Sequence, residues 1–366
     1  MSTHDPQHFA PLDSTAAPAT PPASSSPRAA KQPAANAESP VSLGGRTRPE
    51  PDSDSASLAH ALEAPLLAEC QGRLSEISWF RSASSSSGSA TGTARWRGEE
   101  GEAEVIVKLP LGPSEYRWTT ELGRSDARSP TPRVFAAGLE LGGYDLAWVV
   151  EERVRGEPVP ARMREGDALH VLQAAADFHD AALRVRPAIE RPRALDWQSS
   201  LALAREVCHA GAIADAQRWN EGVKKVTKAL PRLLSRWNER PINAWCHGDL
   251  HPGNVIRLSQ PRDDSHAGVL IDLALVHPGH WLEDAVYLER QYWAAPQLLH
   301  GVKPVSTLAR LRRERGLSVD SDYPIFADIR RVLMASLVPA FLDREGHPKY
   351  VAASLDVLEK TLPHVA

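Results

Sequence analysis

Residues 247–254, with the sequence HGDLHPGN, constrain this chain more than any other segment. The apolar stretch 244–246 leads into them, and a second apolar run, 269–271, ends at an aspartate. Gly and Pro inside the segment favour a loop between short strands over a helix. We therefore expect three oxygen-bearing side chains to converge beside one sheet edge, namely Asp249, Asn254 and Asp272.

The composition is that of a folded protein large enough for two lobes, with 366 residues, 42% of them hydrophobic. A net charge of −4 without a run of Lys and Arg gives no reason to expect a nucleic-acid partner. No segment approaches the roughly 20 apolar residues that span a bilayer, and no signal peptide is evident. The three cysteines are widely separated, without a CxxC or disulfide pattern. We expect a cytoplasmic protein without a membrane partner; its oligomeric state stays open.

Residues 1–56 differ from the remainder of the chain. They hold 10 of the 30 prolines, much Ser and Ala, and one aromatic residue, Phe9. Such a segment cannot bury enough apolar surface to offset the loss of chain entropy on folding. We expect a disordered tail, with a docking or regulatory segment as the alternative.

The following residues, 57–152, are predicted to form a small lobe dominated by an antiparallel sheet. Apolar residues at helical spacing predict a leading helix at 58–71, and residues 113–124 predict a second helix. Runs rich in Ile, Val, Trp and Phe between Ser and Gly clusters predict strands. These strands cover 74–81, 91–97, 103–109, 133–137 and 146–151.

Residues 153–366 are predicted to form a larger, mostly helical lobe, so the fold class is α+β. Its only short strands flank the HGDLHPGN segment. Long stretches of helical periodicity cover 166–182, 197–209, 215–237, 281–293 and 325–343.

The polar residues of the central segment suit phosphoryl transfer to a hydroxyl. That reaction needs a carboxylate to position the acceptor, a metal ion to neutralise phosphate charge, and fixed cations. Asp249 is the candidate base. Asn254 and Asp272 are the candidate ligands of Mg²⁺, which prefers hard oxygen donors and keeps several waters.

Residues 247–254 resemble the catalytic loop of the aminoglycoside phosphotransferase and choline kinase group, which are relatives of protein kinases. The resemblance implies a two-lobed protein-kinase-like fold that binds ATP and Mg²⁺ between its lobes. It also implies that Asp249 is the catalytic base, that Asn254 binds magnesium, and that Asp272 replaces the aspartate of the protein-kinase DFG motif. Residues 272–274 are Asp-Leu-Ala here, a departure that is usual in this group.

The resemblance extends to residues 105–108, Val-Ile-Val-Lys, where a β-branched strand presents a lysine. Lys108 is therefore expected to contact the α- and β-phosphates of ATP. Taken alone, a lysine that ends an apolar strand is more often solvated, but its position upstream of the catalytic loop reverses that estimate. By the family's spacing, Glu115 is a better acidic partner for Lys108 than Glu121.

Two further segments are candidates for nucleotide contacts. Ser87 and Gly88 lie in a Ser/Gly run where a phosphate-covering loop belongs, although the run is not a clean GxGxxG and could be a plain flexible turn. Residues 149–156 resemble the family's hinge, with adenine contacts expected between Glu151 and Val154, chiefly at Glu152 and Val154. A strand that simply ends in charged residues would give the same pattern.

The histidines in the loop leave one alternative enzyme class open. His247 and His251 flank Asp249, and such a string could supply metal ligands in a metallophosphoesterase. That class needs further His and Asn ligands downstream, and none is found. We expect His247 to support the loop through hydrogen bonds and His251 to pack or cap. In residues 279–285, which resemble another family motif, Asp284 is expected to brace the catalytic loop.

The sequence thus predicts transfer of the γ-phosphate of ATP to the hydroxyl of a small molecule. Aminoglycosides, amino alcohols such as choline, homoserine and sugars remain open as acceptors. A nucleotide-binding pseudokinase is one rival, although Lys108, Asp249, Asn254 and Asp272 are all present. A protein kinase is the other, but the chain between Asp272 and Trp281 is too short for a peptide-docking segment.

Overall fold

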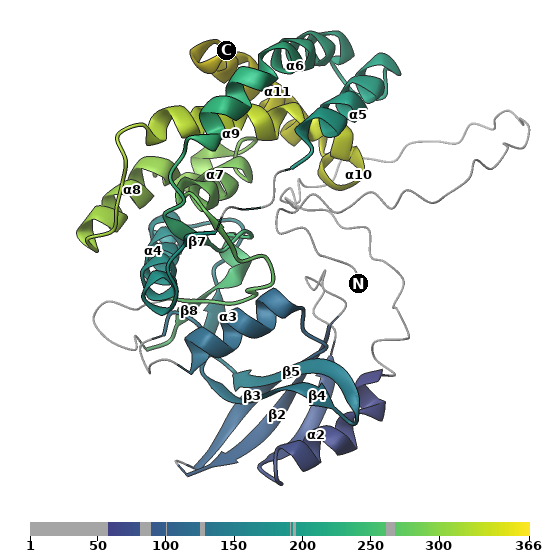
Figure 1. Ribbon diagram of the computed structural model, residues 1–366, viewed down its shortest axis with the longest axis vertical. Coiled ribbons are helices and arrows are strands. Elements are labelled where there is room, and N and C mark those ends of the chain that lie inside the picture. The colour runs from purple at the N-terminus through teal and green to yellow at the C-terminus, as the bar shows by residue number, and fades with distance from the viewer. Residues whose placement is uncertain are drawn as a thin grey trace, which may run out of the picture.

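The computed structural model describes residues 58–80, 89–99, 101–124, 129–190, 192, 195–260 and 268–366. These residues form two lobes, as predicted: a small lobe built on an antiparallel sheet and a larger, mostly helical lobe (Figure 1). The predicted tail at 1–56 lies outside the described residues. Among the described helices, none is both long and apolar enough to cross a membrane.

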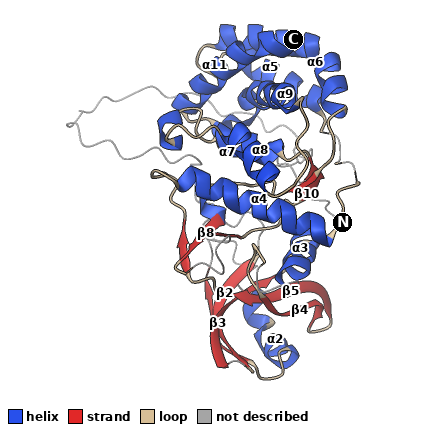
Figure 2. Cartoon of the chain, turned by 90° about the vertical axis from the view of Figure 1, so that its left-hand side faces the viewer, coloured by secondary structure: helices blue, strands red, loops and turns tan. Residues whose placement is uncertain are grey.

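The small lobe contains a five-stranded antiparallel sheet in the order β1-β2-β3-β5-β4. Helix α3 lies between this sheet and the large lobe (Figures 1 and 2). Helix α2 supplies Leu66 to the apolar cluster of the sheet, and Leu62, the residue before the helix, joins the same cluster. The elements are α2 (Glu63–Glu69), β1 (Leu74–Phe80), β2 (Ala90–Gly98), β3 (Gly101–Leu109), α3 (Pro113–Gly123), β4 (Val134–Leu141) and β5 (Tyr144–Glu152).

Strand β3 shows how the sequence sets the direction of one functional side chain. Val105, Val107 and Leu109 are fully buried in the small-lobe core. Because side chains alternate between the two faces of a strand, Ile106 and Lys108 lie on the opposite face. Lys108 is therefore directed away from the core that holds the sheet together.

The large lobe consists mainly of helices around one extensive apolar core. Helix α4 packs against α8, against β9 and against β7, so it supports the short strands of the site. The helices are α4 (Asp167–Val185), α5 (Trp197–His209), α6 (Ala216–Asn238), α7 (Leu282–Arg290), α8 (Pro304–Glu314), α9 (Tyr323–Ser336), α10 (Leu342–Glu345) and α11 (Pro348–Val365), with 3₁₀ turns η1 (Pro252–Asn254), η2 (Pro296–Leu299) and η3 (Val338–Phe341).

Five short strands form two small sheets in the large lobe, and β8 lies on the side of that lobe that faces the small lobe (Figure 2). One sheet has the order β6-β8-β9, and the other pairs β10 with β7. The strands are β6 (Gly156–Pro158), β7 (Ala244–Cys246), β8 (Val255–Leu258), β9 (Gly268–Leu270) and β10 (His277–Gly279). Segment 247–254 therefore connects the two sheets.

The predicted helix at 325–343 is wrong as a single element. Helix α9 ends at Ser336, and η3 and α10 follow. Pro339 explains the break, because proline lacks an N–H and disfavours helical backbone in the preceding residue. The predicted strands at 133–137 and 146–151 extend further, to Leu141 and from Tyr144, around a tight turn in which Gly142 and Gly143 have positive φ.

Candidate active site

The loop after β7 folds back on itself and brings Asn254 beside Asp249. The side-chain Nδ2 of Asn254 donates to the main-chain oxygen of Asp249 over 3.0 Å and to its Oδ2 over 3.3 Å. The main-chain N–H of Asn254 donates to His251 O over 3.0 Å within η1. With its amide nitrogen turned to Asp249, Asn254 has its carbonyl oxygen as the end that can face a cation.

Ile271, the residue before Asp272, is fixed by two hydrogen bonds to this loop. Its N–H donates to Asn254 O over 3.0 Å, and its carbonyl oxygen accepts from Nε2 of His247 over 3.0 Å. His247 Nδ1 in turn accepts from the N–H of Asp249 over 3.3 Å, which requires the tautomer with the proton on Nε2. His247 thus supports the loop through hydrogen bonds, as predicted, and links it to the segment that carries Asp272.

Asp272 adopts a backbone conformation that is rare for a non-glycine residue, with φ at +63°. Such a conformation costs about 1–3 kcal/mol and is concentrated at functional sites. Four residues separate Asp272 from β10, which pairs with β7. The chain therefore returns at once to the large lobe, without room for a peptide-docking segment.

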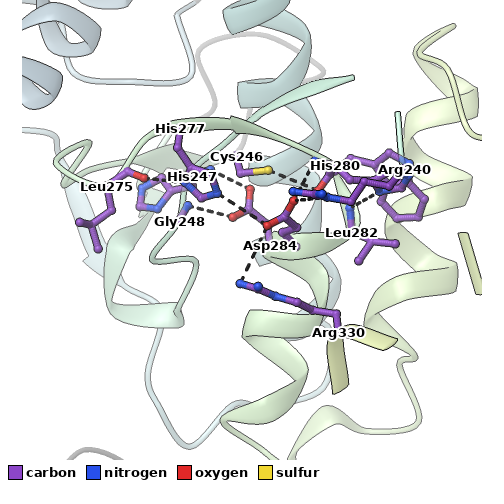
Figure 3. A network of polar contacts seen from close by, with 12 residues as sticks. Arg240, Cys246, His247, Gly248, Leu275, His277, His280, Leu282, Asp284 and Arg330 are labelled. Atoms are coloured by element: carbon purple, nitrogen blue, oxygen red, sulfur yellow. Dashed lines mark hydrogen bonds and ion pairs between the residues drawn. The ribbon is translucent and has the colours of Figure 1, made fainter. Parts of the chain in front are cut away.

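Asp284, at the start of α7, braces the loop from behind, as predicted. Its carboxylate accepts from the N–H groups of His247 (2.8 Å) and Gly248 (3.0 Å), and Figure 3 shows these bonds converging on it. Burial opposes the charged carboxylate, but the hydrogen bonds from His179 (2.9 Å) and from the main-chain N–H of Gly248 keep the pKa of Asp284 below its usual value. Asp284 therefore stays ionised and holds the loop.

A layer of buried polar side chains continues behind Asp284. Nη1 of Arg312 donates to Nδ1 of His179 over 3.1 Å, so His179 is neutral and donates from Nε2. Burial is the main reason that the pKa of His179 is lowered. Nε of Arg240 lies 3.2 Å from Oε1 of Glu283, and Nη2 of Arg330 lies 3.9 Å from Oε2 of the same residue. No local sequence pattern predicted this layer, because its members are far apart along the chain.

Lys108 of β3 lies between two buried carboxylates. Its Nζ is 2.9 Å from Oε1 of Glu151 and 3.6 Å from Oε1 of Glu115. Burial opposes the charged ammonium, but these carboxylates outweigh it and raise the pKa of Lys108. Glu121 forms an ion pair with Arg186 instead, at 3.0 Å. The structure brings the predicted Glu115 to Lys108, and it adds Glu151 as a closer partner that sequence analysis had assigned only to the hinge.

In the predicted hinge, residues 149–156, some main-chain N–H groups already form hydrogen bonds within the protein. Glu152 N–H donates to Arg133 O over 2.8 Å, and Arg153 N–H donates to Glu104 O over 3.2 Å. Within the part of the chain that the structure describes, the N–H of Val154 forms no hydrogen bond to another main-chain oxygen. Ser87 and Gly88, the other candidate nucleotide contacts, lie outside the described residues.

Tyr287 is a site residue that sequence analysis missed. Its hydroxyl donates to Oδ1 of Asp249 over 2.7 Å. Tyr287 follows Asp284 by three residues on α7, and side chains at that spacing share one helix face. The helical spacing from Asp284 was the available signal. His251 also lies near the carboxylate, with its Nε2 3.7 Å from Oδ2 of Asp249.

The side chains fit magnesium better than a metal ion whose ligands all come from protein side chains. Asn254 and Asp272 offer two hard oxygen donors, as Mg²⁺ prefers when phosphates and waters complete its coordination. The negative charge of Asp272 also contributes to the raised pKa values of Lys108 and Glu115, so Asp272 lies near both side chains. Across the described ranges, no three His, Cys, Asp or Glu side chains are grouped as metal ligands.

Comparison with known proteins identifies the family. The model of the phosphotransferase enzyme family matches residues 86–317, more than half of the chain, and the chain belongs to that family. It is therefore a phosphotransferase. No curated protein sequence gives a significant match to this chain.

Solved structures share the kinase-like fold at low sequence identity. An aminoglycoside phosphotransferase from Alicyclobacillus acidocaldarius is 15% identical, with a TM-score of 0.50, over 83% of this chain and 94% of its own. A Ralstonia eutropha protein assigned to the aminoglycoside phosphotransferases is 14% identical, with a TM-score of 0.55, over 84% of this chain and 99% of its own. At these identities the likeness concerns the fold alone.

Proposed function

We propose that this phosphotransferase uses ATP and Mg²⁺ and transfers the γ-phosphate to a hydroxyl of an aminoglycoside, an amino alcohol or a sugar-like acceptor. One observation carries the proposal. Asn254 contacts the carboxylate of Asp249, and Ile271, bonded to the same loop, fixes the segment that presents Asp272. This set combines one base with two oxygen ligands for the metal ion.

Asp249 is the proposed catalytic base. A carboxylate in this position accepts or orients the proton of the attacking hydroxyl, and little covalent work is then left to the protein. Both oxygens of Asp249 already have donors, Tyr287 at Oδ1 and Asn254 at Oδ2. The carboxylate is thereby held in one orientation before the acceptor arrives, which lowers the entropy cost of the reaction.

Asn254 and Asp272 are the residues that would hold Mg²⁺. A bound Mg²⁺ would neutralise phosphate charge during transfer. Asp272 supplies a full negative charge and Asn254 a neutral oxygen, so the protein contributes only part of the coordination. The left-handed backbone at Asp272 is consistent with a side chain that is held in place for a ligand.

Nucleotide binding is assigned to the small lobe, residues 57–152, and its junction with the helical lobe, residues 153–366. Lys108 would contact the phosphates with the support of Glu115. The carbonyl oxygen of Glu152 and the N–H of Val154 would meet adenine, because the neighbouring Glu152 and Arg153 N–H groups are already used. Ser87 and Gly88 are proposed to cover the phosphates, as their place in the sequence indicates.

The test is Asp249→Asn, which keeps the size of the side chain and removes its charge. We expect kcat to fall by roughly 10³-fold or more, because the acceptor proton loses its base, while binding of ATP with Mg²⁺ persists. Asp145→Asn, an exposed acid on β5, is the matched control and should keep full activity. Turnover near the wild-type level in Asp249→Asn would contradict the assignment. Turnover is screened with aminoglycosides, amino alcohols and sugars as acceptors.

A further inference from the structure

The closer carboxylate beside Lys108 belongs to the sheet and not to helix α3. Nζ of Lys108 is 2.9 Å from Oε1 of Glu151, within hydrogen-bond distance, and 3.6 Å from Oε1 of Glu115, beyond it. The side chains of Glu151 and Glu115 are only 5% and 6% exposed, so solvent screens neither contact strongly. The two acids therefore differ in their distance from Nζ of Lys108 and not in their burial.

The register of the sheet fixes Glu151 relative to Lys108. Lys108 pairs with Val149, and Ile106 pairs with Glu151 in the antiparallel β3–β5 ladder. Lys108 and Glu151 are thus diagonal neighbours on one face of two hydrogen-bonded strands. Their separation is set by the backbone hydrogen bonds of the sheet.

Glu115 reaches Lys108 from a different element, the first turn of α3. Within the described chain, its second oxygen, Oε2, is buried without a hydrogen-bond partner. Burial raises the pKa of Glu115, which weakens it as an anionic partner. Glu115 can therefore support Lys108, but its contact is longer and depends on the position of a helix.

We propose that Glu151 is the residue that positions Lys108 toward the nucleotide phosphates, and that Glu115 has a secondary role. The proposal rests on the phosphate role of Lys108 in the proposed function. It means that the strand pairing of the sheet determines the orientation of Lys108. A shift of α3 would leave the 2.9 Å contact in place.

The experiment compares Glu151→Gln with Glu115→Gln, since both changes remove charge and keep shape. KM for ATP and kcat are measured with Mg²⁺, and the affinity for Mg·ATP is measured by calorimetric titration. We expect Glu151→Gln to weaken Mg·ATP binding about tenfold or more, because a buried ion pair loses its closer partner. Glu115→Gln should weaken it about two- to threefold. Glu121→Gln, on the same helix but paired with Arg186, is the control.

The double variant gives an independent readout. In Glu151→Gln, Lys108 has only Glu115 as a partner, so adding Glu115→Gln should cost more than it does in the wild type. Additive losses, or a larger loss of affinity in Glu115→Gln than in Glu151→Gln, would overturn the proposal. If Glu151→Gln does not fold in a thermal-unfolding check, Glu115→Gln decides alone: near-wild-type affinity supports the proposal, and a loss of tenfold or more rejects it.

Lys108→Met separates this proposal from the proposed function. If Lys108→Met loses affinity while Glu151→Gln keeps it, Glu151 is rejected and the phosphate role of Lys108 stands. If Lys108→Met binds and turns over Mg·ATP like the wild type, the phosphate role is wrong and the role of Glu151 is rejected with it.

Discussion

The hydroxyl of Tyr287 and the carboxylate of Asp249 share a 2.7 Å hydrogen bond, and the tyrosine is the donor. Burial and the negative charge of Asp249 raise the pKa of Tyr287 well above its usual value, so the hydroxyl stays protonated across neutral pH. A donor of this kind stabilises the ionised form of a carboxylate. The state of the proposed base therefore depends on a residue of helix α7.

Tyr287→Phe should shift the acidic limb of the pH profile of kcat/KM to higher pH, because the carboxylate loses that donor. At a pH on this acidic limb, kcat/KM should fall roughly tenfold, which corresponds to the loss of a hydrogen bond to a charged group. Tyr292→Phe is the control, since its hydroxyl donates to Ala161 O over 2.8 Å. An unchanged limb in Tyr287→Phe would show that the bond does not tune the base.

Asp272→Ala should lose the magnesium-dependent part of nucleotide affinity, because phosphate charge is then poorly neutralised. Titrations of ATP with and without Mg²⁺ measure that part. Alanine is also strained at the φ of +63°, so Asp272→Asn serves as a backbone control, as asparagine tolerates this region. Retention of the full magnesium effect in both variants would refute the ligand role.

Gly248→Ala should destabilise the protein more than Gly166→Ala, although both glycines have positive φ, +81° and +86°. A Cβ at Gly248 would lie 2.3 Å from Leu275 O, while a Cβ at Gly166 would meet nothing within 4 Å. We expect a loss of about 1 kcal/mol at Gly166 from backbone strain alone, and about 3 kcal/mol or more at Gly248. Urea denaturation measures both, and equal losses would argue against the steric contact.

His277 and His179 should change the pH dependence of stability in opposite directions. Burial opposes the charged form of His277, but Glu283 outweighs it and raises its pKa. Its contribution to stability is therefore complete below the unfolded value of about 6.5 and is lost as pH rises through the higher folded value. The lowered pKa of His179 means that the unfolded chain binds a proton the folded protein excludes, so stability falls below pH of about 6.5.

Free energies of unfolding at pH 8 and pH 6 test this difference. His277→Asn should cost more stability at pH 6 than at pH 8, and His179→Asn should cost more at pH 8. The change between the two pH values should be roughly 0.5–1 kcal/mol for each variant. The same sign for both would contradict the assigned protonation states.

Local patterns predicted much of the architecture, because periodicity and turn residues act over short distances. The strand that presents Lys108 and the helix at 197–209 were predicted close to their observed bounds. The end of α9 was missed although Pro339 marks it, because the apolar periodicity continues beyond the proline. Helices α8 and α11 lie in the lobe that was predicted to be mostly helical, but their bounds were not predicted.

The contacts of the site were harder to predict, because they depend on how elements pack. Asp284 was predicted to brace the loop, but its partner His179 comes from α4, 105 residues away. Glu151 illustrates the same limit: its side chain could be assigned to Lys108 only after the β3–β5 register was known. Residue types identified the chemistry, while partners required the tertiary structure.

The two hydrogen bonds that join Ile271 to the catalytic loop have a consequence for sequence variation at this site. Both use main-chain atoms of Ile271, whereas the His247 bond uses an imidazole ring. Position 271 can therefore accept other side chains of similar size without breaking the link, but position 247 cannot lose its ring. Relatives that diverge here should vary at 271 and retain histidine at 247.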